Sequence, residues 1–294
     1  MTRPVGWLVT GAAGMLGREV LAVLRHDPTA RVTATTRAAL DITHAHAVRA
    51  AVPGHDIVLN AAAWTAVDLA ETHESEALAV NGEAVAGLAA ACAAAAVPLI
   101  HVSTDYVFRG DDPAPYPEYA ATAPLNAYGR SKLAGERAVL EGLPATGYVV
   151  RTSWLYGGHG RDFVKRVARR VGAGETVRVV DDQHGQPTWA GELAVRLVEL
   201  GRRAIARRAP AGIYHGSAGG RTTWFGFARA AVTRLGLDPG LVHPCRTEDF
   251  PTAAARPRYA VLGHDRWALA GLPPPAPWQD MLREALPLPP GAAP

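Results

Sequence analysis

Cysteine is scarce in this sequence, and net charge is small. Cys92 and Cys245 are the two cysteines among 294 residues. So few cysteines argue against a disulfide framework or a cysteine-built metal site, and they fit the reducing cytoplasm. The net charge is +3, which does not indicate nucleic-acid binding because that usually needs a concentrated basic stripe. A weakly positive chain does suit a small anionic substrate.

Long uninterrupted apolar runs are also missing. The longest, Ala84 to Ile100, is mostly alanine, directly follows Glu83 and is broken by Gly87 and Pro98, so we expect no membrane span. Met1 to Leu8 is too short and too polar for a signal peptide. Hydrophobic residues make up 48% of the chain and charged residues 19%, which allows a sizeable core. We expect a soluble, cytoplasmic protein that binds neither membrane nor nucleic acid.

Short β-rich runs alternate with longer helical patterns in the first half. Strands without polar alternation, separated by helices, are typical of a parallel sheet covered on both faces. The regular order favours a doubly wound α/β fold of the Rossmann type. The predicted strands are Val5–Thr10, Arg31–Thr36, Asp56–Ala62, Pro98–Phe108 and Gly147–Tyr156, and the predicted helices are Arg18–Arg25, His44–Ala51, Ser75–Ala96 and Asn126–Leu140.

The regular alternation of predicted strands and helices ends after about Tyr148, where segments become shorter and richer in proline, glycine and arginine. We place a Rossmann domain at residues 1–150 and a smaller, partly interwoven domain at 151–294, with some later segments returning to the first. The predicted elements here are the helices Asp162–Val171, Glu192–Arg207, Trp224–Leu235 and Trp278–Ala285 and the short strands Thr176–Val180 and Gly212–Gly216.

A glycine-rich turn follows the first predicted strand. Gly11 can make the tight exit from the strand, Gly14 lets the backbone approach a pyrophosphate, and Gly17 lets the next helix pack closely on the sheet. The start of that helix offers free N–H groups to phosphates. An ordinary βα turn is the alternative. The spacing of three between the first two glycines resembles extended short-chain dehydrogenases.

The end of the second predicted strand bears on cofactor choice. An NAD-specific enzyme typically carries an acidic residue here, whereas this chain has Thr36 and Arg37. Arg37 can meet a 2′-phosphate, although a solvated loop arginine is an equal alternative. We expect NADPH as the cofactor, with NADH left open.

Tyr128 and Lys132 open the helix that begins at Asn126. Positions four apart share a helical face, and a nearby ammonium lowers the pKa of a tyrosine toward the range useful for proton transfer. Reduction of a ketone needs a hydride at carbon and a proton at oxygen, and Tyr128 can supply the proton. Ser103 or Thr104, at the end of the fourth strand, can donate a hydrogen bond to the carbonyl oxygen. Packing and capping roles are the alternatives.

Taken together, these motifs resemble dTDP-4-dehydrorhamnose reductases, a family of the extended short-chain dehydrogenase/reductase superfamily. The resemblance spans nearly the whole chain. The segments that carry it are Gly11–Gly17, Asn60–Asp68, Ser103–Phe108, Ala123–Glu136, Arg151–Trp154, Asp182–Thr188 and Ala255–Pro257.

The resemblance implies an activity and a set of site residues. The activity is NAD(P)H-dependent reduction of the 4-keto group of a dTDP-4-keto-6-deoxyhexose by a monomer or homodimer. Thr104, Tyr128 and Lys132 are implied to be catalytic, and Thr104, Asp105 and Trp154 to contact the sugar. The resemblance implies that Gly14, Met15, Leu16, Asp41, Ile42, Ala63, Trp64 and Thr65 line the dinucleotide. We also expect Gly11, Arg37, Ala61, Ala62, Tyr128 and Lys132 to bind the cofactor.

Departures from the family pattern argue against a metal. Some family members dimerise through a magnesium ion held by glutamates. Glu19 matches one of those positions, but Gly191 occupies another, with Glu192 one position along. His44 and His46 do not face each other on a helix and make a poor metal pair. We therefore expect no bound metal.

Two other readings stay open at this stage. A sugar-nucleotide epimerase or dehydratase of the same superfamily would recycle its cofactor, whereas a reductase consumes it. A non-catalytic regulatory subunit would bind a dinucleotide without turnover, and would have no need of the set Thr104, Tyr128 and Lys132. His101, inside a buried-looking strand, is expected to be a hydrogen-bonded core histidine.

Overall fold

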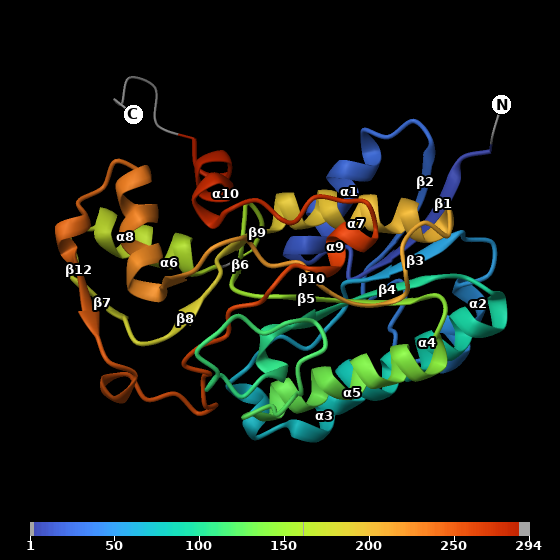
Figure 1. Ribbon diagram of the computed structural model, residues 1–294, viewed down its shortest axis with the longest axis horizontal. Helices are drawn as coiled ribbons and strands as arrows, with labels where there is room; N and C mark the ends of the chain where they lie inside the picture. The colour runs from blue at the N-terminus through green and yellow to red at the C-terminus, as the bar shows by residue number, and fades with distance from the viewer. Residues whose placement is uncertain (1–2, 161, 288–294) are drawn as a thin grey trace.

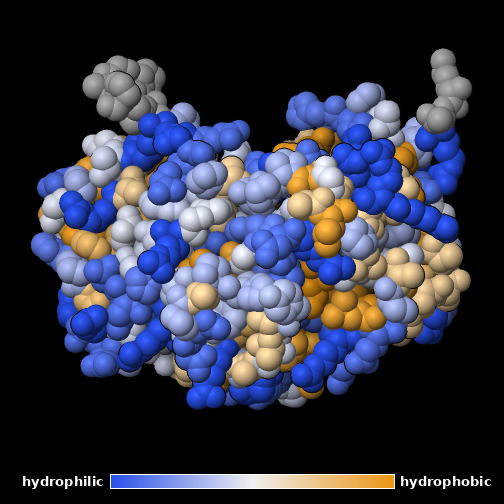
Figure 2. Space-filling model, in the orientation of Figure 1, coloured by the Kyte–Doolittle hydropathy of each residue, from blue (hydrophilic) through white to orange (hydrophobic). Residues whose placement is uncertain are grey.

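The computed structural model describes residues 3–160 and 162–287. Met1 and Thr2, which begin the segment tested above for a signal peptide, and residues 288–294 of the predicted domain at 151–294 lie outside this range. Hydrophilic side chains cover most of the molecular face in Figure 2, and apolar ones form smaller patches between them.

A parallel sheet forms the centre of the molecule (Figure 1). In spatial order its strands are β10 (Gly212–His215), β5 (Gly147–Thr152), β4 (Leu99–Thr104), β3 (Ile57–Asn60), β1 (Val5–Thr10) and β2 (Ala30–Thr35). All neighbouring pairs run parallel. The predicted doubly wound α/β fold is confirmed. β10 comes from residues after 151, so the second half of the chain supplies one edge of this sheet.

Helices cover both faces of the sheet. On one face lie α1 (Met15–Arg25), α7 (Ala190–Ile205) and α9 (Arg266–Leu269), and on the other lie α2 (Ala45–Ala51), α4 (Ala84–Ala95) and α5 (Ala127–Gly142). β1, β3 and β5 are buried almost throughout, which is why these strands lack polar alternation.

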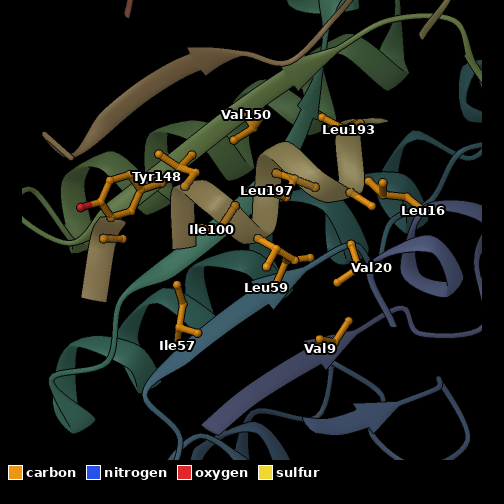
Figure 3. Close-up of a cluster of buried hydrophobic side chains, with 14 of the residues drawn as sticks. Val9, Leu16, Val20, Ile57, Leu59, Ile100, Tyr148, Val150, Leu193 and Leu197 are labelled. Carbon is orange, nitrogen blue, oxygen red and sulfur yellow. The ribbon is translucent and has the colours of Figure 1, made fainter. Parts of the chain in front are cut away.

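One face of the core shows how the two halves of the chain are joined. Figure 3 shows side chains of the strands meeting side chains of α1 and α7, and all of them are buried. Burial of each aliphatic side chain contributes about 1.5–3 kcal/mol, so α7 from the second half stabilises the sheet of the first. The residues labelled there are Val9, Leu16, Val20, Ile57, Leu59, Ile100, Tyr148, Val150, Leu193 and Leu197.

The smaller part lies beyond the carboxyl ends of the strands. It contains three two-stranded pairs, β6 (Leu155–Tyr156) with β9 (Thr188–Trp189), β7 (Val177–Val180) with β12 (Val242–Cys245), and β8 (His184–Gly185) with β11 (Thr222–Thr223). Its helices are α6 (Phe163–Gly172), α8 (Trp224–Arg234) and α10 (Trp278–Ala285). An aromatic core that includes Tyr156, Phe227 and Trp278 holds them together.

The fourth and fifth predicted strands each end four residues earlier than expected. The fourth stops at Thr104, because the Thr104 hydroxyl accepts a hydrogen bond from the Tyr106 backbone N–H and starts the 3₁₀ helix η3 (Asp105–Val107). The fifth stops at Thr152, because Trp154 has a φ of 45°, in the left-handed region that breaks an extended strand. The chain then re-enters a strand as β6, which pairs with β9 rather than with the central sheet.

The predicted helix Ser75–Ala96 is interrupted. It comprises α3 (Glu74–Leu78), a π-helical turn at Ala79–Glu83 and α4. Glu74–Ala95 has the length and mean hydropathy of a candidate membrane span, and half of its most apolar window is buried inside the protein. α4 packs between α2 and α5, so its apolar side chains serve the core.

Candidate active site

A cavity of about 800 Å³ lies at the carboxyl ends of β1, β3, β4 and β5. Parallel α/β sheets bind their ligands at this edge. All the site residues predicted above line it, from the glycine-rich turn after β1 to Trp154 after β5. The structure therefore brings the whole predicted set together, and their individual roles remain predictions.

The glycine-rich turn forms one end of the cavity. Gly11 has a φ of 69°, and a Cβ there would lie 2.5 Å from the backbone of Ala61 and Ala62. A Cβ on Gly17 would lie 2.3 Å from the Gly11 carbonyl oxygen. α1 begins at Gly14 with no side-chain cap and no acidic residue in its first turn. These helix-start N–H groups can bind a phosphate.

Arg37 and Asp41 line the cavity after β2. Arg37 Nε lies 3.1 Å from Asp41 Oδ2, and the Arg37 side chain is 86% exposed. The backbone and hydroxyl of Thr43 donate to Asp41 Oδ1. These bonds, with Arg37, lower the pKa of Asp41 to about 2. Arg37 is thus held loosely, with its guanidinium free to contact an added phosphate.

Asn81 supports the loop after β3 and is a residue that the sequence analysis missed. It lies in the π-helical turn and is fully buried. Its side chain accepts from the Trp64 N–H at 2.9 Å and donates to the Trp64 carbonyl at 3.0 Å and to Ser131 Oγ at 3.0 Å. π-helical turns are frequent at functional sites. Here the turn fixes a cavity loop to the helix that carries Lys132.

The predicted catalytic residues lie on β4 and α5. Asn126 caps α5, since its side chain accepts from the Gly129 N–H at 2.8 Å, and this places Tyr128 and Lys132 in the first two turns. Burial and the charge of Asp105 raise the pKa of Tyr128, against the expectation that Lys132 lowers it. Burial lowers the pKa of Lys132 to about 8. Tyr128 therefore keeps its proton at neutral pH.

Ser103 and Thr104 differ in what they can offer a ligand. The Ser103 hydroxyl donates to Glu136 Oε1 at 2.5 Å and is committed to that contact. The Thr104 hydroxyl donates to Asp105 Oδ1 at 3.0 Å, a bond that a ligand can replace. Asp105 Oδ2 is buried without a hydrogen-bond partner among the described residues. Burial raises the pKa of Asp105 to about 7.

Trp154 lies between the cavity and the smaller part. Its ring stacks on Trp224 with centroids 3.7 Å apart and planes 12° apart. A Cβ on Gly185 would lie 2.5 Å from the indole, so the absence of a side chain at Gly185 makes room for the ring. Trp154 thus has a packing role, and it also lines the cavity.

A second cavity, of about 350 Å³, adjoins the first and shares Tyr106 with it. No pattern in the sequence indicates this cavity, because its residues come from segments far apart in the chain. Cationic and aromatic side chains gather there, namely Arg166, Arg170, Arg178, Arg256, Phe163, Trp224 and Phe250. Guanidinium groups suit phosphates, and aromatic faces suit a base.

The two glutamates compared above with the metal ligands of the family each lie beside another side chain. Glu19 faces His159 at 4.0 Å, and Glu192 pairs with Arg196 at 2.9 Å. Within residues 3–160 and 162–287, no group of three or more histidines, cysteines, aspartates and glutamates is placed to hold a metal ion.

Fold and site together define an extended short-chain dehydrogenase/reductase. Residues 6–288 match the family described as RmlD substrate binding domain, and the chain belongs to that family. This is the family that the sequence motifs resemble. It is 52% identical over 283 residues to a dTDP-4-dehydrorhamnose reductase of Streptomyces griseus, covering 96% of this chain and 93% of the relative. It is 49% identical over 286 residues to a dTDP-4-keto-6-deoxy-D-glucose reductase of Streptomyces niveus, covering 96% of each.

A solved structure supports the same family. The dTDP-4-dehydrorhamnose reductase of Bacillus anthracis, in complex with NADP, matches with a TM-score of 0.90 and 35% identity. The match covers 96% of this chain and 98% of that one. The sequence-based family assignment is confirmed.

Proposed function

We propose that this chain catalyses the NADPH-dependent reduction of the 4-keto group of a dTDP-4-keto-6-deoxyhexose in deoxysugar biosynthesis. One observation carries the proposal. Thr104, Tyr128 and Lys132 line the same cavity as the glycine-rich turn, so a proton donor and a dinucleotide site share one space. The family relationship supports the same reaction.

The residues that line the first cavity suit the parts of an NADPH molecule. The start of α1 would hold the pyrophosphate, and Arg37 would contact the 2′-phosphate. The loop Ala61–Thr65 and the pair Tyr128 and Lys132 would line the nicotinamide end. Bound there, the cofactor supplies the hydride that reduces the carbonyl carbon.

Tyr128 supplies the proton in this reaction. Its raised pKa keeps the phenol protonated, which suits a group that donates to a carbonyl oxygen as the hydride reaches the carbon. The Thr104 hydroxyl donates a second hydrogen bond to the same oxygen and stabilises its developing charge. Lys132 orients the cofactor beside them.

The second cavity provides room for the nucleotide of the substrate. Its arginines would pair with the diphosphate, and Phe163 and Phe250 would contact the base. The sugar would then lie between the cavities, near Tyr106, with Asp105 and Trp154 as contacts. We place the substrate domain mainly within residues 151–294. We place the enzyme in the cytoplasm as a monomer or homodimer.

The test is a paired incubation with purified dTDP-4-keto-6-deoxyglucose and NADPH, with and without a 3,5-epimerase. A reductase oxidises one NADPH per sugar reduced, and product analysis of the two arms identifies which 4-ketosugar it accepts. An epimerase or dehydratase would convert sugar without net loss of NADPH. A regulatory subunit would bind NADPH and convert nothing in either arm.

A further inference from the structure

A row of buried polar side chains runs beneath the cavity. Thr10, Asn60 and His101 occupy neighbouring positions on β1, β3 and β4, since the register pairs Thr10 with Asn60 and Asn60 with His101. All three are fully buried. His101 Nε2 then lies 3.2 Å from Lys132 Nζ on α5. The row connects the sheet to the lysine of the candidate active site.

The backbone fixes the orientation of the Asn60 amide. The Ala62 N–H donates to Asn60 Oδ1 at 3.1 Å, and the Thr10 hydroxyl donates to the same oxygen at 2.6 Å. The amide nitrogen of Asn60 therefore faces His101, 2.9 Å from Nδ1. An amide nitrogen only donates, so Nδ1 of His101 accepts and carries no proton.

This arrangement determines the tautomer of His101. Burial lowers the pKa of His101 well below its usual value, so the ring is neutral and its one proton is on Nε2. That N–H points at Lys132 Nζ, which also donates to the Val102 carbonyl at 2.7 Å. An ammonium would oppose one N–H to another, whereas an amine accepts the bond through its lone pair.

We propose that His101 is a positioning residue whose Nε2–H donates to the Lys132 amine and thereby favours the uncharged form of that lysine in the cofactor-free protein. The inference rests on the proposed function only in assigning Lys132 to the reductase site. Lys132 then exchanges its proton at a lower pH than a lysine of ordinary basicity does.

The other charged groups around Lys132 do not reverse this preference. Glu136, one turn along α5, favours the ammonium, but its carboxylate is already paired with Arg151 through bonds of 2.9 and 2.7 Å. On the cavity side, burial raises the pKa of Tyr128 and raises that of Asp105 to about 7. The Tyr128 phenol therefore carries no charge beside the lysine at neutral pH. The Asp105 carboxyl carries only part of a charge, and it is not among the groups that shift the pKa of Lys132.

The sequence makes the lysine measurement direct. Lys132 and Lys165 are its two lysines, so a protein labelled with ¹³C-lysine gives two sets of signals. We expect the Lys132 signal of the cofactor-free protein to titrate about two pH units below the ordinary lysine value. A midpoint at the ordinary value would overturn the proposal.

The tautomer is measured on the same cofactor-free protein by ¹⁵N-histidine NMR. The His101 signals are assigned by their loss in His101→Gln. We expect a protonated Nε2 and an unprotonated Nδ1. A proton on Nδ1 would overturn the proposal, because Nε2 would then accept from an ammonium.

Two variants separate the hydrogen bond from burial. In His101→Gln the amide oxygen can face the lysine, so the Lys132 midpoint should rise by about one pH unit. No rise would mean that burial alone sets the midpoint of Lys132 and would overturn the proposal.

In Asn60→Asp a carboxylate oxygen still accepts from the Ala62 N–H, and the other oxygen faces Nδ1 of His101. The proton of His101 should then move to Nδ1, and an unchanged tautomer would refute the proposal. His26→Gln, at an exposed histidine, is the matched control.

These measurements use neither substrate nor cofactor. A negative NMR result would therefore refute the role of His101 without bearing on the reductase activity. A negative reductase assay would likewise leave the Lys132 titration valid.

Discussion

Tyr128 lies where burial and a neighbouring carboxyl both oppose ionisation of its phenol. Such a group holds its proton until the carbonyl oxygen gains charge during hydride transfer. The neighbouring Thr104 hydroxyl stabilises that charge but has no readily transferable proton of its own at neutral pH. At the scale of single residues, Tyr128 is therefore the proton source on which the reaction depends.

Tyr128→Phe is expected to lower kcat about a hundredfold or more, because the phenyl ring keeps the packing but has no proton to donate. NADPH binding, measured by fluorescence titration, should survive. Near-normal turnover in this variant would remove Tyr128 from the mechanism.

Arg37→Ala is expected to weaken NADPH binding more than NADH binding, by roughly 1–3 kcal/mol, which is typical of a charge-assisted contact to phosphate. Both dissociation constants can be measured by calorimetry. Arg49→Ala is the control, since Arg49 is exposed on α2 and does not line the cavity. Equal losses for the two cofactors would refute a 2′-phosphate contact.

Asp105→Asn is expected to stabilise the protein, and increasingly so as pH rises from about 4 to 7. The buried carboxyl has a pKa of about 7 in the folded protein against 3.8 for the ordinary group, so the folded state binds its proton more tightly. Stability is then lost in the wild type as pH rises through this window. Melting curves at several pH values test this, and a constant difference between the two proteins would contradict it.

At the scale of elements, the site depends on places where regular structure stops. The end of β4 at Thr104, the break after β5 at Trp154 and the π-helical turn around Asn81 each turn a side chain or a loop toward the cavity. Of these positions, Trp154 has a left-handed φ, a conformation that is unfavourable in isolation and persists where surrounding contacts determine it.

Trp154→Ala is expected to raise the KM for the dTDP-4-keto-6-deoxyhexose by roughly an order of magnitude, because an apolar wall beside the sugar methyl group is lost. The KM for NADPH should barely change. Loss of the stack on Trp224 will also lower the melting temperature. Unchanged sugar kinetics with only that lower temperature would assign Trp154 to packing alone.

The features that could be predicted from the sequence are those formed by residues close together along the chain. The glycine turn and the pair Tyr128 and Lys132 are short-range patterns, and both line the cavity as expected. Asn81 could not be found this way, since its partner Trp64 is 17 positions away and an asparagine inside a helical pattern carries no specific signal. The arginines of the second cavity meet only because α6, β7 and the segment near Arg256 fold together.

At the scale of the whole molecule, the expected independence from metal can be tested. Activity should persist in the presence of a chelator, because the carboxylates near Glu19 pair with other side chains or lie apart. The assay compares initial rates of NADPH oxidation with and without EDTA. Loss of activity that magnesium restores would show that metal ligands exist.

The return of the chain to the central sheet decides how this molecule can be divided. β10 hydrogen-bonds to β5, and α7 covers apolar side chains such as Leu59 and Val150. A fragment ending at residue 150 would leave the outer edge of β5 unpaired, which is a template for aggregation. It would also expose the apolar side chains of the sheet that α7 covers. The two parts are thus one cooperative unit, and a permuted or split version of the chain would have to keep α7 and β10 with the cofactor half.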